Sequence, residues 1–425
     1  MVADLDTFFL LYSFDSKRED MKERVNNGGC GPLSLATAMV VLIMACGIKE
    51  VGAPDPYMEM EQESIESSIR PVCCVSGFVY PSGYDWYQDP SSKEVRCSLV
   101  VFADGVPKIK VPVGDGYEVS RDPDMHRVLD GNLYTFYSKD GKTVFRRNGY
   151  PLFRYDGDEV LVDMTISGED IYTLTHKRSG EGFSYRKNGK ILLERFSGET
   201  FGKFWHDGDS LCFSYIQPVA MATGVENRYY IAYDSQPILV QNPDKLKRVW
   251  DIMSHNGMPC QLISLLGMQD VMLLMDGSQR RIKIPSGARV LSCRLFPADS
   301  LIGVECLYEY QDGKRESGIW VEASEYMRFE TGSSIQALRY AGGNAYCLLT
   351  PEQGEGMIFD AGEIVRMPPE YFCVGTRSMT VHEGELYVAM SSRTGSWPVI
   401  WHDNQTDTLR LNGCVSSISF TDLDK

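Results

Sequence analysis

Short apolar runs separated by polar turns fill the chain from about residue 70 to its end. Each run has about five to eight residues rich in Val, Ile, Tyr and Phe, and Gly, Asp, Asn or Pro follows it. This pattern is typical of β-strands, because β-branched and aromatic side chains suit a pleated surface and the turn residues tolerate left-handed backbone. No long stretch has the period of an amphipathic helix, so the pattern predicts an all-β fold.

The predicted strands recur as a unit, and two copies are clear. A Gly-x-Leu-Tyr strand at 131–136 precedes an Arg-Arg-Asn-Gly hairpin at 146–149, and a similar strand at 168–174 precedes Arg-Lys-Asn-Gly at 186–189. The two hairpins lie about forty residues apart, and Asn-Gly favours the backbone of a two-residue hairpin. A four-stranded unit repeated every ~40–50 residues is the signature of a β-propeller.

The spacing of the copies favours eight blades. We place the second strand of each blade near residues 72, 133, 171, 211, 260, 303, 345 and 386. The fifth and sixth copies are weak, so seven blades is the alternative. The first unit lacks an innermost strand before Val72, whereas a spare strand, 414–420, follows the last unit. We therefore predict that the C-terminal strand completes the first blade and closes the ring, which removes the exposed sheet edges. A pair of β-sandwiches or a β-helix does not explain the spare strand.

A different pattern precedes the strands. The apolar run 33–45 ends in Met44-Ala45-Cys46-Gly47 and resembles the cleavage box of bacterial lipoproteins. The run is too short to span a membrane but suits a signal peptide, with a basic start if translation begins at Met21. We predict a leader over 1–45, lipid attached to Cys46, an acidic tether over 46–70 and the propeller over 71–425. A buried core helix over 33–45 is the alternative.

Charge and cysteine content narrow the partners. The formal net charge is −16, which disfavours binding to nucleic acid because an acidic surface repels phosphates. The twelve cysteines form no pair of CxxC motifs, so we predict no zinc site. Many lie inside apolar strands, where a free thiol packs as a small hydrophobe, so we expect few disulfides or none.

Motifs that carry catalysis are absent from the sequence. There is no nucleophile elbow, P-loop, zinc-protease helix or calcium loop, and we predict no metal or other cofactor. Three of the six histidines, His206, His255 and His382, precede a turn glycine or a residue next to one. They are predicted to share one face of the ring, where they act either as turn residues or as converging bases.

Aromatic residues give the sharper indication of a ligand site. Tyr84, Trp86 and Tyr87 fall in the predicted loop between the second and third strands of the first blade, and Trp397 falls in the matching loop of the last blade. These blades are neighbours if the ring closes as predicted. Exposed rings on one face suit stacking on sugars or capture of a peptide. His176 and Arg178 occupy the corresponding position in the third blade. The alternative is that the aromatic rings pack over the blade ends.

The repeated segments resemble those of exported propeller lipoproteins of Bacteroides-type gut bacteria. Residues 166–172, Ile-Ser-Gly-Glu-Asp-Ile-Tyr, are similar to that family's Val-Ser-Gly-x-Asp-Val-Tyr segment. The family's Tyr-Trp-Lys-Asn-Gly segment is matched with Arg146 and Arg186 in place of Trp. The resemblance implies a propeller fold and a membrane address. It implies little chemistry, because most such families have no assigned activity.

Together these patterns predict a binding module, anchored by lipid to the outer membrane, for a glycan or an envelope partner protein. Display on the periplasmic side or on the cell surface stays open. One alternative is an enzyme acting on polysaccharide, a glycoside hydrolase or lyase, which needs carboxylates that converge in a central pocket. The other is a structural scaffold of the envelope, which needs a contiguous apolar patch.

Overall fold

The computed structural model describes residues 72–88, 95–114, 119–120, 122–177, 182–195, 204–207, 210–222, 224–233, 236–240, 243, 245–275, 277–329, 333–351 and 355–421. The predicted leader, Cys46 and the acidic tether lie outside these residues. Within the described part, the regular structure consists of strands and one short 3-10 turn, η2 (Pro123–Met125). No helix in this part is long and apolar enough to cross a membrane.

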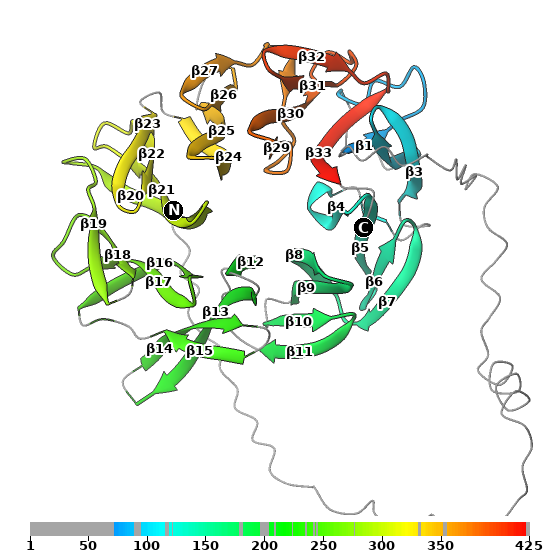
Figure 1. Ribbon diagram of the computed structural model, residues 1–425. Helices are drawn as coiled ribbons and strands as arrows, with labels where there is room; N and C mark the ends of the chain where they lie inside the picture. The colour runs from blue at the N-terminus through cyan, green and yellow to red at the C-terminus, as the bar shows by residue number, and fades with distance from the viewer. Residues whose placement is uncertain are drawn as a thin grey trace, which may run out of the picture. The chain divides into compact units, whose positions relative to one another are not determined.

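Eight antiparallel sheets form an eight-bladed β-propeller (Figure 1). Each blade corresponds to one predicted unit, and all eight second strands lie where the repeat places them, which rules out seven blades. From the innermost strand outward, the blades are blade 1, β33 (Gly413–Thr421), β1 (Val72–Val79), β2 (Cys97–Ala103), β3 (Val106–Val113); blade 2, β4 (His126–Leu129), β5 (Asn132–Lys139), β6 (Lys142–Arg147), β7 (Tyr150–Asp156); blade 3, β8 (Glu159–Ser167), β9 (Asp170–Lys177), β10 (Phe183–Lys187), β11 (Lys190–Arg195); blade 4, β12 (Phe204–Asp207), β13 (Ser210–Met221), β14 (Gly224–Tyr233), β15 (Gln236–Val240); blade 5, β16 (Leu246–His255), β17 (Met258–Leu265), β18 (Val271–Met275), β19 (Ser278–Ile282); blade 6, β20 (Arg289–Ala298), β21 (Leu301–Glu309), β22 (Arg315–Val321), β23 (Ser324–Phe329); blade 7, β24 (Ser333–Ala341), β25 (Asn344–Pro351), β26 (Met357–Asp360), β27 (Glu363–Arg366); and blade 8, β28 (Tyr371–Phe372) with β29 (Met379–His382), β30 (Glu385–Ser392), β31 (Val399–His402), β32 (Gln405–Thr408).

The repeated Asn-Gly pairs form the hairpins between third and fourth strands. Asn148 and Asn188 have φ values of 51° and 48°, and the glycine after each also has positive φ. Each asparagine side chain accepts a hydrogen bond from the second strand of its blade, from Leu133 N at 2.8 Å and from Ile171 N at 2.9 Å. The motif recurs because one residue both makes the turn and fastens it to the neighbouring strand.

The C-terminal strand closes the ring, as predicted. β33 pairs antiparallel with β1, and Figure 1 shows red β33 beside blue β1. The hydroxyl oxygens of Ser76 and Ser417 lie 2.6 Å apart, and Tyr80 N donates to Asn412 O at 2.8 Å. A Cβ at Gly77 would lie 2.3 Å from the Cys414 carbonyl oxygen, so the close approach of these strands requires glycine there.

Two aspartates join innermost strands of neighbouring blades, and each follows a bulge in its strand. Asp163 on β8 accepts from its neighbour Met164 N at 2.9 Å and from Phe204 N of blade 4 at 2.9 Å. Asp251 on β16 accepts from Ile252 N at 2.9 Å and from Leu295 N of blade 6 at 2.8 Å. The bulge turns the carboxylate towards the next blade, and this bond fixes how adjacent walls of the ring are spaced.

One disulfide, between Cys293 on β20 and Cys306 on β21, is present among the described residues. The other eight described cysteines are free, and six of them are buried. This agrees with the expectation of few disulfides and of thiols packed inside strands.

Candidate functional site

Trp86 belongs to the interior of blade 1. Its side chain is 3% exposed and packs with the apolar residues between β1 and β2. Tyr80 lies between Trp86 and Tyr84, with ring centroids 6.3 Å and 5.5 Å away. Two of the predicted ligand residues therefore pack over the end of the blade, Trp86 fully and Tyr84 in part, and neither presents a free ring for stacking.

The exposed aromatic rings predicted for a ligand are Tyr87 and Trp397, which are 39% and 50% exposed. Phe372 on β28 connects the first of them to blade 8, because its ring centroid lies 6.2 Å from that of Tyr87. The guanidinium of Arg393 lies 5.1 Å from the Phe372 ring. The guanidinium of Arg410 lies 5.7 Å from the Trp397 ring.

The segment that carries Arg410 also binds the loop of blade 1. Asn412 Nδ2 donates to Pro81 O at 2.6 Å and to Tyr84 O at 3.1 Å. The two loops thus flank the junction of blades 8 and 1, where the ring closes. We call Tyr87, Phe372, Arg393, Trp397 and Arg410 the seam surface. Phe372 and the two arginines escaped sequence reasoning, although the Tyr371-Phe372 pair before the last inner strand was visible.

The remaining predicted ligand residues lie elsewhere. His176 is half-buried near the end of β9 and pairs across the sheet with Val160 and Phe183. Arg178 lies outside the described residues. No described contact brings His176 to the seam surface.

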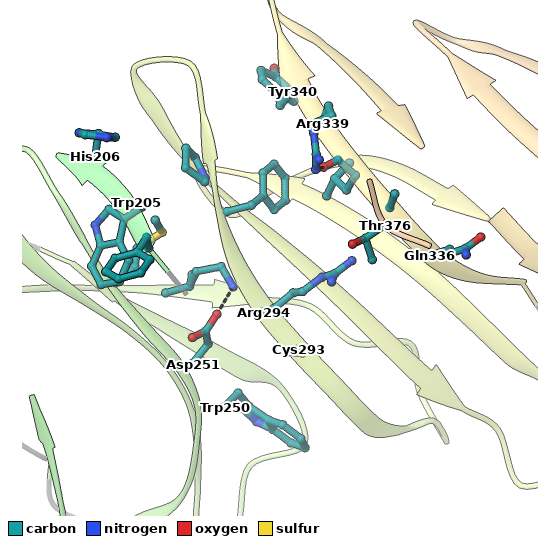
Figure 2. Close-up of a pocket in the computed structure, with 17 residues that line it drawn as sticks. Trp205, His206, Trp250, Asp251, Cys293, Arg294, Gln336, Arg339, Tyr340 and Thr376 are labelled. Atoms are coloured by element: carbon teal, nitrogen blue, oxygen red, sulfur yellow. Dashed lines mark hydrogen bonds between the residues drawn. The ribbon is translucent and has the colours of Figure 1, made fainter. Parts of the chain in front are cut away.

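A second candidate site lies between the innermost strands. A pocket of about 820 Å³ is bounded by β12, β16, β20 and β24 and by Thr376 in the segment between β28 and β29 (Figure 2). We call it the channel pocket. Its aromatic and charged lining includes Trp205, His206, Trp250, Arg294, Arg339 and Tyr340.

Two arginines dominate the charge of the channel pocket. Arg294 is paired with the buried carboxylate of Glu305 on the adjacent strand. Arg339 has no carboxylate partner among the described residues, and its guanidinium donates to the carbonyl of Leu338 at 2.9 Å. Enclosure within the ring, followed by the positive charge of Arg294, lowers the pKa of Arg339. The two cations are thus held near each other without full compensation.

The carboxylate in the pocket lining has a structural role. Asp251 uses both oxygens to accept backbone amides, one of them from blade 6. No described group of His, Cys, Asp and Glu side chains could hold a metal ion. This part of the chain shows no converging pair of carboxylates of the kind that a glycosidase needs.

The three repeated histidines lie at the ends of innermost strands β12, β16 and β29, and each has different neighbours. His206 lines the channel pocket, His255 contacts the side chain of Asn256 at 3.1 Å, and His382 stacks on Phe420 with centroids 4.1 Å apart. Their contacts are those of turn and packing residues rather than of a shared base.

No family model matches the sequence, and no curated protein matches it. Among solved structures, the chain is similar to the β-propeller domain of the trilobed protease from Pyrococcus furiosus, with 12% identity and a TM-score of 0.41 over 68% of this chain and 94% of that one. A prolyl endopeptidase gives 12% identity and a TM-score of 0.42 over 71% of this chain, which spans only 51% of that protein. BBS1N in complex with ARL6DN gives 11% and 0.35, over 63% of this chain and 87% of that one. The assignment of eight blades rests on the strand pairing of this chain itself.

Proposed function

We propose that this protein is an exported, lipid-anchored β-propeller that binds a glycan or a partner protein through its seam surface. The observation that carries the proposal is the exposure of Tyr87 and Trp397 in two loops that flank the ring closure. In this proposal Cys46 carries the lipid and residues 46–70 tether the ring to the outer membrane.

The composition of the seam surface supports binding of this kind. Aromatic rings offer apolar area with few rotatable bonds, so ordering them on binding costs little entropy. Arg393 and Arg410 lie beside the rings and can donate hydrogen bonds to hydroxyl or carbonyl oxygens. Because Trp86 is fixed in the core and its ring centroid lies 6.4 Å from that of Phe372, the surface is held in place before a ligand arrives.

The alternative functions have less support. An enzyme acting on polysaccharide needs free carboxylates in a central pocket, and Asp251 there is engaged by backbone amides. A scaffold would use exposed apolar residues, and the outer strands of blades 3 and 4 present some. These are Ile191, Leu192, Ile238 and Leu239. They lie on separate blades, and nothing in the described part of the chain indicates a partner that covers them.

A glycan array with the purified domain tests the ligand. We expect binding by the wild type and at least a tenfold weaker signal for Trp397→Ala and Tyr87→Ala, since stacking on an aromatic ring contributes about 1 kcal/mol or more. Tyr150→Ala is the matched control, because Tyr150 is 48% exposed on outer strand β7. A wild type that binds neither glycans nor envelope proteins, or variants that bind as well as wild type, would contradict the proposal.

Metabolic labelling with a fatty acid tests the anchor. The wild type should incorporate the label and fractionate with membranes, whereas Cys46→Ala should do neither, because the thioether bond requires the sulfur of Cys46. Cys30→Ala, which changes a cysteine before the proposed cleavage site, should label normally. Equal labelling of wild type and Cys46→Ala would exclude this anchor.

A further inference from the structure

We propose that the channel pocket binds the anionic group of a small ligand, a carboxylate, sulfate or phosphate ester, between Arg294 and Arg339. This goes beyond the seam surface, with which the pocket shares no residue. The two arginines project from neighbouring blades, Arg294 from β20 and Arg339 from β24, and Figure 2 shows both side chains extending into the same space.

The charges around the pocket leave one cation uncompensated. Glu305 offsets the charge of Arg294 from behind, on the adjacent strand β21. Asp251 lies in the lining, but its oxygens accept the backbone amides of Ile252 and Leu295. Arg339 donates only to a backbone carbonyl. An anion that reaches Arg339 would therefore find an unpaired guanidinium and reduce its repulsion with Arg294.

Neighbouring groups suit an oxyanion on a small polar molecule. Figure 2 shows the Arg294 guanidinium directed towards Thr376, whose hydroxyl can donate to a further oxygen. Guanidinium groups recognise carboxylate, sulfate and phosphate through parallel, charge-assisted hydrogen bonds. The rings of Trp250 and Tyr340 line the same pocket and offer apolar surface to the rest of the ligand.

Size and overall charge restrict the ligand further. A volume of about 820 Å³ lies within the usual range for small-molecule sites. The net charge of −16 on the chain repels a polyanion at long range, whereas a single anionic group inside the ring feels the nearby arginines most. We therefore expect a small acidic molecule, such as an acidic sugar, rather than a nucleic acid.

Isothermal titration calorimetry with matched sugars tests the site. The probes are glucuronic acid, glucose 6-sulfate and glucose 6-phosphate, with neutral glucose as the uncharged reference. At least one acidic sugar should bind the wild type more tightly than glucose, and the tightest identifies the source of the anion. Arg339→Gln should weaken that binding by about tenfold to a hundredfold, the range for a hydrogen bond to a charged group.

Arg366→Gln is the control, because it removes the same charge from exposed outer strand β27 of the same blade, and it should bind as wild type does. Arg339→Lys, which keeps the charge without the planar fork, should bind between wild type and Arg339→Gln. Trp397→Ala should bind these probes normally, which separates this site from the seam surface. The proposal is wrong if no acidic sugar binds better than glucose, or if folded Arg339→Gln retains wild-type affinity.

Discussion

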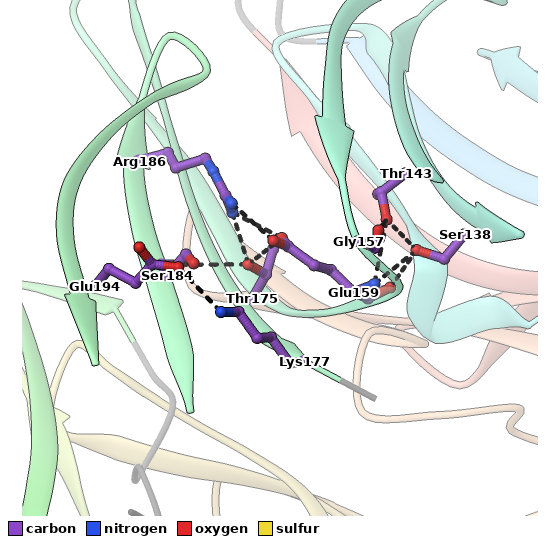
Figure 3. Close-up of polar contacts among 9 residues, drawn as sticks. All are labelled: Ser138, Thr143, Gly157, Glu159, Thr175, Lys177, Ser184, Arg186 and Glu194. Carbon is purple, nitrogen blue, oxygen red and sulfur yellow. Dashed lines mark hydrogen bonds and ion pairs between the residues drawn. The ribbon is translucent and has the colours of Figure 1, made fainter. Parts of the chain in front are cut away.

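At the scale of single residues, the repeats are matched in backbone but not in buried chemistry. Arg186 stands where the family that the chain resembles has Trp, and it is buried between blades 2 and 3 (Figure 3). It forms two bonds of 2.7 Å with Glu159 and lies 4.2 Å above the Tyr155 ring. Thr175 donates to the same carboxylate at 2.6 Å. The arginine keeps the planar contact with an aromatic ring that Trp would make, and it requires a buried anion in return.

Removing one partner of this ion pair should destabilise the ring. Glu159→Gln leaves Arg186 buried with only neutral acceptors, so we expect a loss of about 3–5 kcal/mol in the free energy of unfolding. The double variant Glu159→Gln/Arg186→Met removes both charges and should recover part of that loss. Urea denaturation of the wild type, both single variants and the double variant measures the coupling. Additive losses, with no recovery in the double variant, would show that the two side chains do not depend on each other.

Prediction from sequence was least reliable at this scale. Tyr84, Trp86 and Tyr87 are adjacent in an aromatic loop, yet Trp86 is buried while Tyr87 is exposed. Which ring turns inward depends on Tyr80 and on Phe372 from another blade, and no local pattern encodes contacts between segments so distant in the chain.

At the scale of elements, the innermost strands are tied together by bulge aspartates. Asp163 and Asp251 each bridge to the next blade through a backbone amide. Sequence reasoning identified the strands from their alternation and their turns, because both are local features. It did not identify the bulges, since a single extra residue in a strand leaves little trace in the apolar pattern. The channel pocket was missed for the same reason, because strands from four blades build its walls.

Asp251→Ala should loosen the junction of blades 5 and 6. The amides of Ile252 and Leu295 lose their acceptor in a buried position, so we expect a loss of about 2–4 kcal/mol in unfolding free energy. Asp251→Asn keeps one carbonyl oxygen and should lose less. Glu355→Ala, at an exposed loop carboxylate, should leave stability unchanged. Urea denaturation ranks the four proteins, and an Asp251→Ala variant as stable as Glu355→Ala would refute this role.

At the scale of the whole molecule, a strand from the C-terminus completes the first blade, and the seam surface exists only because of this. Eight blades and the closing strand were both predictable, because repeat spacing and a spare strand are properties of the chain as a whole. The ligand was not, because the residues that would select it come from blades whose side chains do not repeat. The account therefore depends on ring closure between β1 and β33, with Ser76 opposite Ser417.

A disulfide across this junction tests the closure most directly. The hydroxyl oxygens of Ser76 and Ser417 are 2.6 Å apart, so Ser76→Cys/Ser417→Cys should form a bond within one chain on mild oxidation. Peptide mapping should find residues 76 and 417 joined in monomeric protein, and the melting temperature should rise, because the bond closes a very long loop. Each single variant should show neither effect. Two cysteines that remain open to alkylation, or that join only between chains, would contradict a ring closed by its own C-terminal strand.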